Sequence, residues 1–132
     1  FKLDANSRIS LSNNDSGTQN TVFGSLAGTN IDAGSNYNVF IGHNVGGGSL
    51  DDATENTGVG YSALANLTSG DTNTAIGRSA GLSITTGAEN TIVGDKAGDA
   101  IGVGNSNTLV GQAAGGALTD GDNNVAIGQV KP

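Results

Sequence analysis

The sequence predicts an all-β repeat protein, a β-solenoid of about seven coils of 17–18 residues. The first observation is a pentapeptide, in which Asn is followed by Thr or Val, a variable residue, a bulky apolar residue and Gly. It occurs seven times, beginning at Asn20, Asn38, Asn56, Asn73, Asn90, Asn107 and Asn124. The second observation is the nearly constant spacing of 18, 18, 17, 17, 17 and 17 residues. A fixed period of this size is typical of stacked repeats.

Three apolar columns keep the same phase, counting each Asn as the first position. The fourth position is bulky and apolar throughout, at Phe23, Ile41, Val59, Ile76, Val93, Val110 and Ile127. The eighth position is small, at Ala27, Val45, Ala63, Ala80, Ala97 and Ala114. The twelfth position is a long aliphatic residue, at Ile31, Leu50, Leu67, Ile84, Ile101 and Leu118. We expect all three columns to fill the coil, with the fourth position as the core side of a short β-branched strand. One-residue insertions, near 35–37 and 46–48, fall between these columns.

Residues 1–19 lie outside the repeat and residues 20–132 form it. Phe1, Leu3, Ile9 and Leu11 alternate with polar residues, which is typical of extended chain. We expect an N-terminal arm that caps the open end of the first coil. The chain begins at Phe1 rather than Met, so we interpret it as a segment of a longer protein.

Composition narrows the class of partner. The net charge of −7 with only five Lys and Arg disfavours nucleic acid and anionic membranes. No Cys is present, so disulfides and thiolate metal sites are excluded, and no apolar run is long enough to span a bilayer. The 23 Gly recur at fixed phases, which indicates turns rather than disorder.

The third position is also apolar or small, and alternation along a strand predicts that it faces outward if the fourth faces inward. Stacking would then form an outward apolar stripe from Val22, Phe40, Gly58, Ala75, Ile92, Leu109 and Ala126. Because such a stripe usually marks an interface, we expect lateral association of parallel copies with cyclic symmetry. Cover by the coil's own loop is the alternative.

The remaining polar residues favour structural roles. We expect the Asn column to hydrogen-bond from coil to coil. The Thr column, interrupted at Val39 and Val125, admits ice binding as an alternative to simple strand packing. A lone His43 cannot form a triad or a closed metal site within one chain. The loop carboxylates match no calcium-loop spacing, so we expect a solvated acidic face, no metal, no cofactor and no catalytic constellation.

Residues 60–77, Gly-Tyr-Ser-Ala-Leu-Ala-Asn-Leu-Thr-Ser-Gly-Asp-Thr-Asn-Thr-Ala-Ile-Gly, closely resemble a repeat of phage tail fibres and large bacterial surface proteins. In that family the repeat often precedes an endosialidase-type intramolecular chaperone domain that trimerises fibres. The resemblance extends over residues 20–128. It is also similar to the shorter repeats in the heads of trimeric autotransporter adhesins.

What the resemblance implies is a homotrimeric, virion or cell-surface fibre segment without enzymatic activity. Its function would be to space or present a receptor-binding surface, either in a phage tail fibre or, alternatively, in a bacterial adhesin. We expect any receptor, a cell-surface glycan or a protein, to contact loops near Tyr37, His43, Asp51 and Tyr61, where insertions and aromatic residues concentrate.

Overall fold

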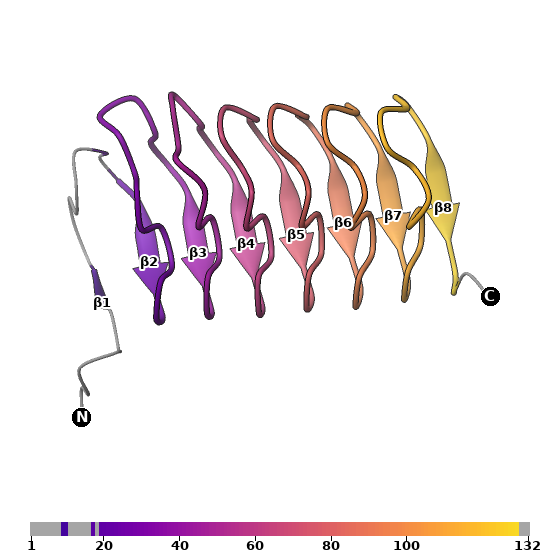
Figure 1. Cartoon of the computed structure of the whole chain (residues 1–132), viewed down its shortest axis with the longest axis horizontal. Coiled ribbons are helices and arrows are strands. Elements are labelled where there is room, and N and C mark those ends of the chain that lie inside the picture. The colour runs from indigo at the N-terminus through magenta and orange to yellow at the C-terminus, as the bar shows by residue number, and fades with distance from the viewer. Residues whose placement is uncertain (1–8, 11–16, 18, 130–132) are drawn as a thin grey trace.

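The structure, a computed structural model, describes residues 9–10, 17 and 19–129. This part of the chain contains no helix and forms one sheet whose strand order follows the sequence (Figure 1). The strands are β1 (Ile9–Ser10), β2 (Thr21–Phe23), β3 (Val39–Ile41), β4 (Thr57–Val59), β5 (Thr74–Ile76), β6 (Thr91–Val93), β7 (Thr108–Val110) and β8 (Val125–Ile127). The predicted β-solenoid is thereby confirmed.

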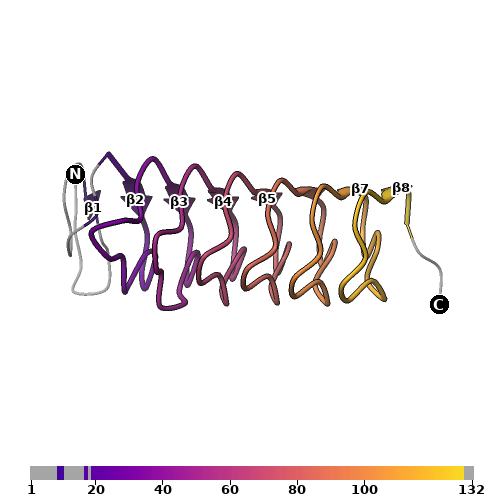
Figure 2. The same ribbon diagram turned by 90° about the horizontal axis from the view of Figure 1, so that it is seen from above.

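Strands β2 to β8 are all parallel and pair in repeat register. Thr74 of β5, for example, pairs with Thr57 of β4 and with Thr91 of β6. The intervening residues return around the coil, so that seven strands enclose about six turns, and the strands lie along one flat side (Figure 2). Six strand spacings of about 4.8 Å make a rod about 29 Å long.

At the N-terminal end, β1 pairs antiparallel with β2, with Ile9 opposite Phe23 and Ser10 opposite Val22. The other arm residues singled out above, Phe1, Leu3 and Leu11, lie outside the described residues. The division into an arm (1–19) and a repeat segment (20–132) therefore stays a prediction.

Each coil turns at a fixed glycine directly after its strand. At Gly77 the φ angle is +137°, a region that residues with a Cβ rarely adopt. A Cβ on Gly77 would also lie 2.4 Å from the carbonyl oxygen of Gly94 in the next coil. Both the backbone conformation and the coil stacking therefore require glycine at the fifth position.

The inward column of the strand is the third position, and this corrects the predicted core and the predicted interface. Phe40 and Ile92 are fully buried, whereas Phe23 is 50% exposed and Ile127 is 76% exposed. The predicted core residues face outward, fully or partly exposed, at Phe23, Ile41, Val59, Ile76, Val93, Val110 and Ile127. The predicted interface residues lie on the inward side of the strands and are buried or partly buried, at Val22, Phe40, Gly58, Ala75, Ile92, Leu109 and Ala126.

The reversal follows from the Asn column. Asn73 is 1% exposed, so the first position of the repeat points into the coil. Because side chains alternate along an extended strand, the third position then points inward, and the second and fourth point outward. The columns at the eighth and twelfth positions line the core as predicted, with Leu118 partly buried at the C-terminal end.

Varied side-chain sizes in the third position are matched across neighbouring coils. Phe40 of β3 pairs with Gly58 of β4, and a Cβ on Gly58 would lie 2.5 Å from the Val45 side chain and 3.3 Å from the Phe40 ring. Leu64, which replaces a glycine of the repeat, is fully buried and lies next to Gly58. The core is thus filled by complementary volumes rather than by one repeated residue type.

Candidate interaction surfaces

The Asn column forms a buried hydrogen-bond ladder along the whole rod. The N–H of each Asn donates to Oδ1 of the Asn one coil earlier, as in Asn73 to Asn56 at 3.0 Å. Its Nδ2 also donates to a backbone carbonyl of its own coil, as in Asn73 to Gly87 at 2.8 Å. The prediction that this column is structural is confirmed, and its amides are occupied in joining coils.

The outward side chains of the second and fourth positions form a flat surface, which we call the sheet face. Its first column contains Thr21, Val39, Thr57, Thr74, Thr91, Thr108 and Val125, and its second is the fourth-position column named above. Phe23, Ile41, Ile76 and Ile127 are the most exposed large apolar side chains of the second column. An apolar stripe does run along the rod, but it is formed by the fourth position and bordered by Thr.

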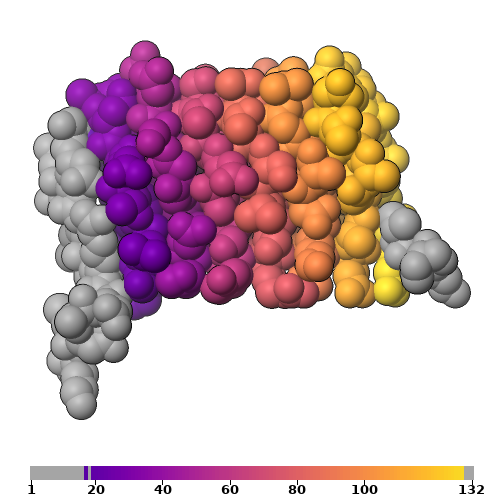
Figure 3. Space-filling view, in the orientation of Figure 1, coloured from indigo at the N-terminus to yellow at the C-terminus, as the bar shows by residue number. Residues whose placement is uncertain are grey.

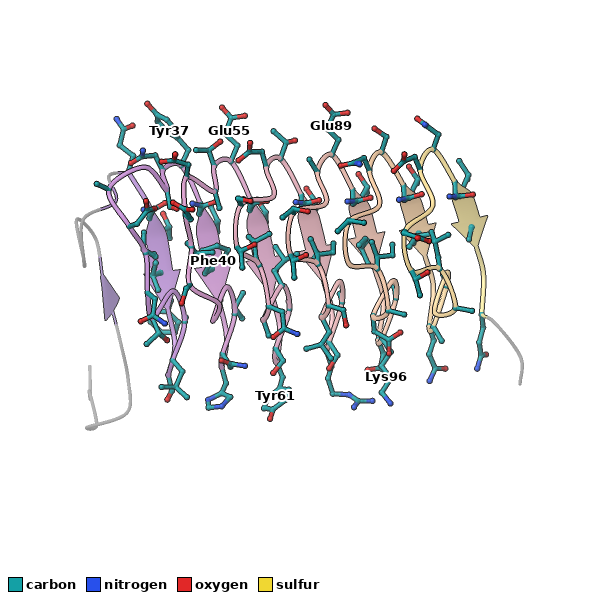
Figure 4. All side chains as sticks on the ribbon, turned by 45° about the horizontal axis from the view of Figure 1, so that its top comes forward. Tyr37, Phe40, Glu55, Tyr61, Glu89 and Lys96 are labelled. Carbon is teal, nitrogen blue, oxygen red and sulfur yellow. The ribbon has the colours of Figure 1, made fainter. Side chains whose placement is uncertain are left out.

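A second surface is formed by the residue that follows each turn glycine. This column, the turn ridge, consists of Ser25, His43, Tyr61, Arg78, Asp95, Gln112 and Gln129. Tyr61 projects from the lower edge of the rod together with Lys96, which follows Asp95 (Figure 4). The backbone holds the column in line from Ser25 to Asp95, because each of these ridge carbonyls accepts a bond from the next coil, as in Ser79 N–H to Tyr61 O at 2.8 Å.

Ridge side chains pair from coil to coil. The rings of His43 and Tyr61 stack with centroids 5.3 Å apart and planes 15° apart. Arg78 forms an ion pair with Asp95, in which a terminal nitrogen donates to Oδ2 at 2.9 Å and Nε lies 2.8 Å from Oδ1. Gln129 donates to Gln112 at 2.9 Å.

A shallow hollow of about 490 Å³ opens beside the C-terminal part of the ridge. Small residues form its floor, including Ala113, Gly116 and Ala117, and polar side chains form its rim, namely Lys96, Asp99, Gln112 and Gln129.

The opposite edge of the rod is acidic. Tyr37, Glu55 and Glu89 project from it, on the side of the rod away from Tyr61 and Lys96 (Figure 4). Further carboxylates bind backbone groups there, as Asp71 does by accepting from Thr54 N–H at 2.7 Å. Among the residues with a described placement, no group of three or more His, Asp or Glu side chains gathers closely enough to hold a metal ion.

Of the four predicted receptor-contact residues, the structure brings only His43 and Tyr61 together. Tyr37 lies on the acidic edge, and Asp51 adjoins Asp52, whose N–H donates to Asp32. The partners Arg78, Asp95, Gln112 and Gln129 were not predicted as site residues, although they share the repeat phase of His43 and Tyr61. This shared position in the repeat is the feature from which the sequence could have identified them.

In the described part of the chain, no helix is long and apolar enough to cross a membrane. Comparisons of the chain with protein-family models, with curated proteins and with solved structures find no match.

Proposed function

We propose that this chain is a shaft segment of a fibre, which associates with copies of itself and spaces or presents a receptor-binding surface. The observation that carries the proposal is the sheet face, an uninterrupted strip of Thr and bulky apolar side chains on a straight rod. Resemblance of the repeat to those of phage tail fibres and bacterial surface adhesins supports the same function. The same resemblance favours a location on a virion or on a cell surface.

Mechanical rigidity supports the shaft role. Every coil is joined to the next by a backbone ladder, by the buried Asn ladder and by the core columns, so bending must break several contacts at once. The space-filling view has the coils packed against one another along the rod (Figure 3).

Self-association through the sheet face follows from its composition. Three residues per strand and six strand spacings give a strip about 10 Å wide and about 29 Å long. This area, about 300 Å², is similar to the largest apolar patch of a typical monomer, and such patches often have a function in binding. Copies that bury the strip around a common axis, as a homotrimer, form a closed assembly.

Charge favours a parallel arrangement of the copies. Glu55, Asp71 and Glu89 lie on the acidic edge, whereas Arg78 and Lys96 lie on the ridge side. Antiparallel copies packed face to face would bring two acidic edges together, which is repulsive. Parallel copies related by an axis along the rod bring the acidic edge of one chain to the ridge side of the next.

Light scattering after size exclusion tests the proposal. Wild type should have three times the chain mass of 12.9 kDa. Ile76→Arg places a charge in the centre of the sheet face and should give the monomer mass, with the β-sheet circular dichroism retained. The matched control is Asn66→Arg, at an exposed position away from the strands, which should stay trimeric. A monomeric wild type, or an unchanged Ile76→Arg assembly, would contradict it.

The outward Thr column supports a second candidate function, binding to ice. Five of the seven second positions are Thr, and they stand one coil apart on a flat sheet. An ice-binding protein should inhibit ice recrystallisation as a monomer and lose this activity in Thr74→Tyr. A fibre segment should be inactive in that assay at every concentration, so the two functions are distinguished by one measurement.

A further inference from the structure

Hydrogen-bonding and aromatic side chains concentrate on the turn ridge beyond what the coil requires. Of the described part of the chain, its one His, its one Arg and one of its two Tyr all occur in this column, as His43, Arg78 and Tyr61. The repeat imposes no residue type here, since the column runs from Ser25 to Gln129 without any preference. Positions that folding leaves free are those where a repeat protein carries its binding residues.

The ridge is already ordered for binding. Backbone bonds at 2.8 Å hold Tyr61 O to Ser79 N–H and Arg78 O to Lys96 N–H. The His43–Tyr61 stack and the Arg78–Asp95 ion pair fix the side chains in turn. Tyr61 is nevertheless 57% exposed and the Arg78 side chain 56% exposed. Exposed groups that are ordered before binding lose little conformational entropy when a partner arrives.

We infer that the turn ridge binds a neutral saccharide chain laid along the axis of the rod. The groups left over from the side-chain pairings along the ridge are the second terminal nitrogen of Arg78, Nε2 of Gln112 and Oε1 of Gln129, which present donors and an acceptor to hydroxyl groups. Tyr61, whose ring stacks on His43, offers the exposed remainder of its ring and a polar tip. Successive ridge positions are one coil apart, about 4.8 Å, so the ridge offers contacts at regular intervals along the rod.

The hollow beside the ridge extends the same surface. Ala113 and Ala117 give it an apolar floor for the carbon face of a sugar ring, and Gln112 and Gln129 supply amides at its rim. A concave, partly apolar site with a few polar groups is the usual form of a small-ligand subsite. Its position in line with the ridge lets one polymer occupy both.

Charge selects a neutral chain over a charged one. The ridge and the hollow together carry two cations, Arg78 and Lys96, and two carboxylates, Asp95 and Asp99, which balance. Arg78 is paired with Asp95, so a polyanion gains no free cluster of cations. The site also lies outside the sheet face, so this inference does not rest on self-association.

The experiment is a printed array of linear neutral oligosaccharides built from glucose, galactose, mannose or N-acetylglucosamine, probed with the labelled full chain. The tightest binder is then measured by calorimetry with three variants. Tyr61→Ala and Arg78→Ala should each lose about tenfold in affinity or more. Tyr37→Ala is the matched control, because Tyr37 is also 57% exposed but lies on the acidic edge, and it should bind as wild type does.

Circular dichroism and light scattering on the same variants separate this result from folding and from assembly, since all three residues are exposed and outside the sheet face. Three outcomes would overturn the inference. One is an array on which no neutral saccharide is retained, and another is equal binding by wild type, Tyr61→Ala and Arg78→Ala. The third is retention of anionic glycans alone, abolished by high salt.

Discussion

Asn90 donates two hydrogen bonds to the same atom of Asn73, its Oδ1, from the backbone N at 3.1 Å and from Nδ2 at 2.9 Å. Asn73 in turn donates from Nδ2 to the Gly87 carbonyl and to Asn56 Oδ1. One buried amide therefore ties together three consecutive coils.

Replacing that amide should be severely destabilising. Asn73→Ala leaves the Asn90 N–H and the Gly87 carbonyl without their partner in a dry interior, at a cost of about 3 kcal/mol of unfolding free energy. Urea unfolding followed by circular dichroism measures it. Asn66→Ala, at an exposed Asn, is the control and should change stability by less than about 0.5 kcal/mol. Equal effects at the two positions would mean that the ladder contributes nothing.

Glycine at the fifth position should be irreplaceable, unlike glycine elsewhere. In Gly77→Ala the added methyl meets the Gly94 carbonyl at 2.4 Å and φ is +137°, so we expect a loss of about 3 kcal/mol or more. At Gly102 the nearest atom to an added Cβ is 3.9 Å away, and φ is outside the strained region. Gly102→Ala should be neutral or slightly stabilising in the same thermal unfolding experiment.

The Asn ladder and the turn glycines explain which parts of the structure the sequence could predict. Fixed spacing was enough for the solenoid, the turn glycines and the core columns of Ala80 and Ile84, because stacking repeats align equal positions. It did not decide which strand face was inward, since both the third and the fourth positions are apolar. Asn73 could have decided it, because an invariant amide inside a coil fixes the alternation of the residues that follow.

The ridge was only half predictable for a different reason. His43 and Tyr61 stand out by residue type, whereas Gln112 and Gln129 gain meaning only from sharing a phase with them. Pairing between side chains one coil apart, as in Arg78 with Asp95, depends on stacking geometry rather than on local sequence.

Because Gly58 and Val45 fill complementary volumes in the core, the losses of unfolding free energy caused by substitutions at the two positions should not be additive. Gly58→Ala forces a methyl to within 2.5 Å of the Val45 side chain, and overpacking of this kind costs about 2 kcal/mol. Val45→Ala leaves a small cavity at a similar cost of about 2 kcal/mol. The double variant should lose at least about 1 kcal/mol less than the sum, because the new methyl occupies the vacated space. Additive losses in urea unfolding would contradict the packing described for these coils.

On the acidic edge, side-chain oxygens accept from backbone N–H groups one coil earlier, and a gap in this ladder should be repairable. Asn105 Oδ1 accepts from the Ala88 N–H at 2.9 Å, and Asp71 Oδ1 accepts from the Thr54 N–H at 2.7 Å. Ala88 occupies the same repeat position but offers no acceptor to the Asp71 N–H. Ala88→Asn should therefore raise the unfolding free energy by about 1 kcal/mol. Ala33→Asn, at an exposed position, is the control; a similar gain there would point to composition rather than to the ladder.

Asp32 should make the first coil sensitive to acid. The Ser35 hydroxyl, which donates to Asp32 Oδ1, holds the pKa of this carboxyl below its ordinary value of 3.8, and backbone N–H groups of Ser35 and Asp52 act in the same direction. Because the folded pKa is the lower one, the contribution of Asp32 is present above pH 3.8 and is lost as the pH falls through the folded pKa.

Asp32→Asn cannot titrate, so it should be less stable than wild type at neutral pH, and the difference should shrink as the solution is acidified. Urea midpoints of the two proteins, measured from about pH 6 to about pH 2, give that difference directly. Subtracting one midpoint from the other at each pH removes the pH dependence that the remaining carboxylates contribute to both proteins. A difference that stays constant over this range would mean that Ser35 does not favour the charged form of Asp32 in the folded chain.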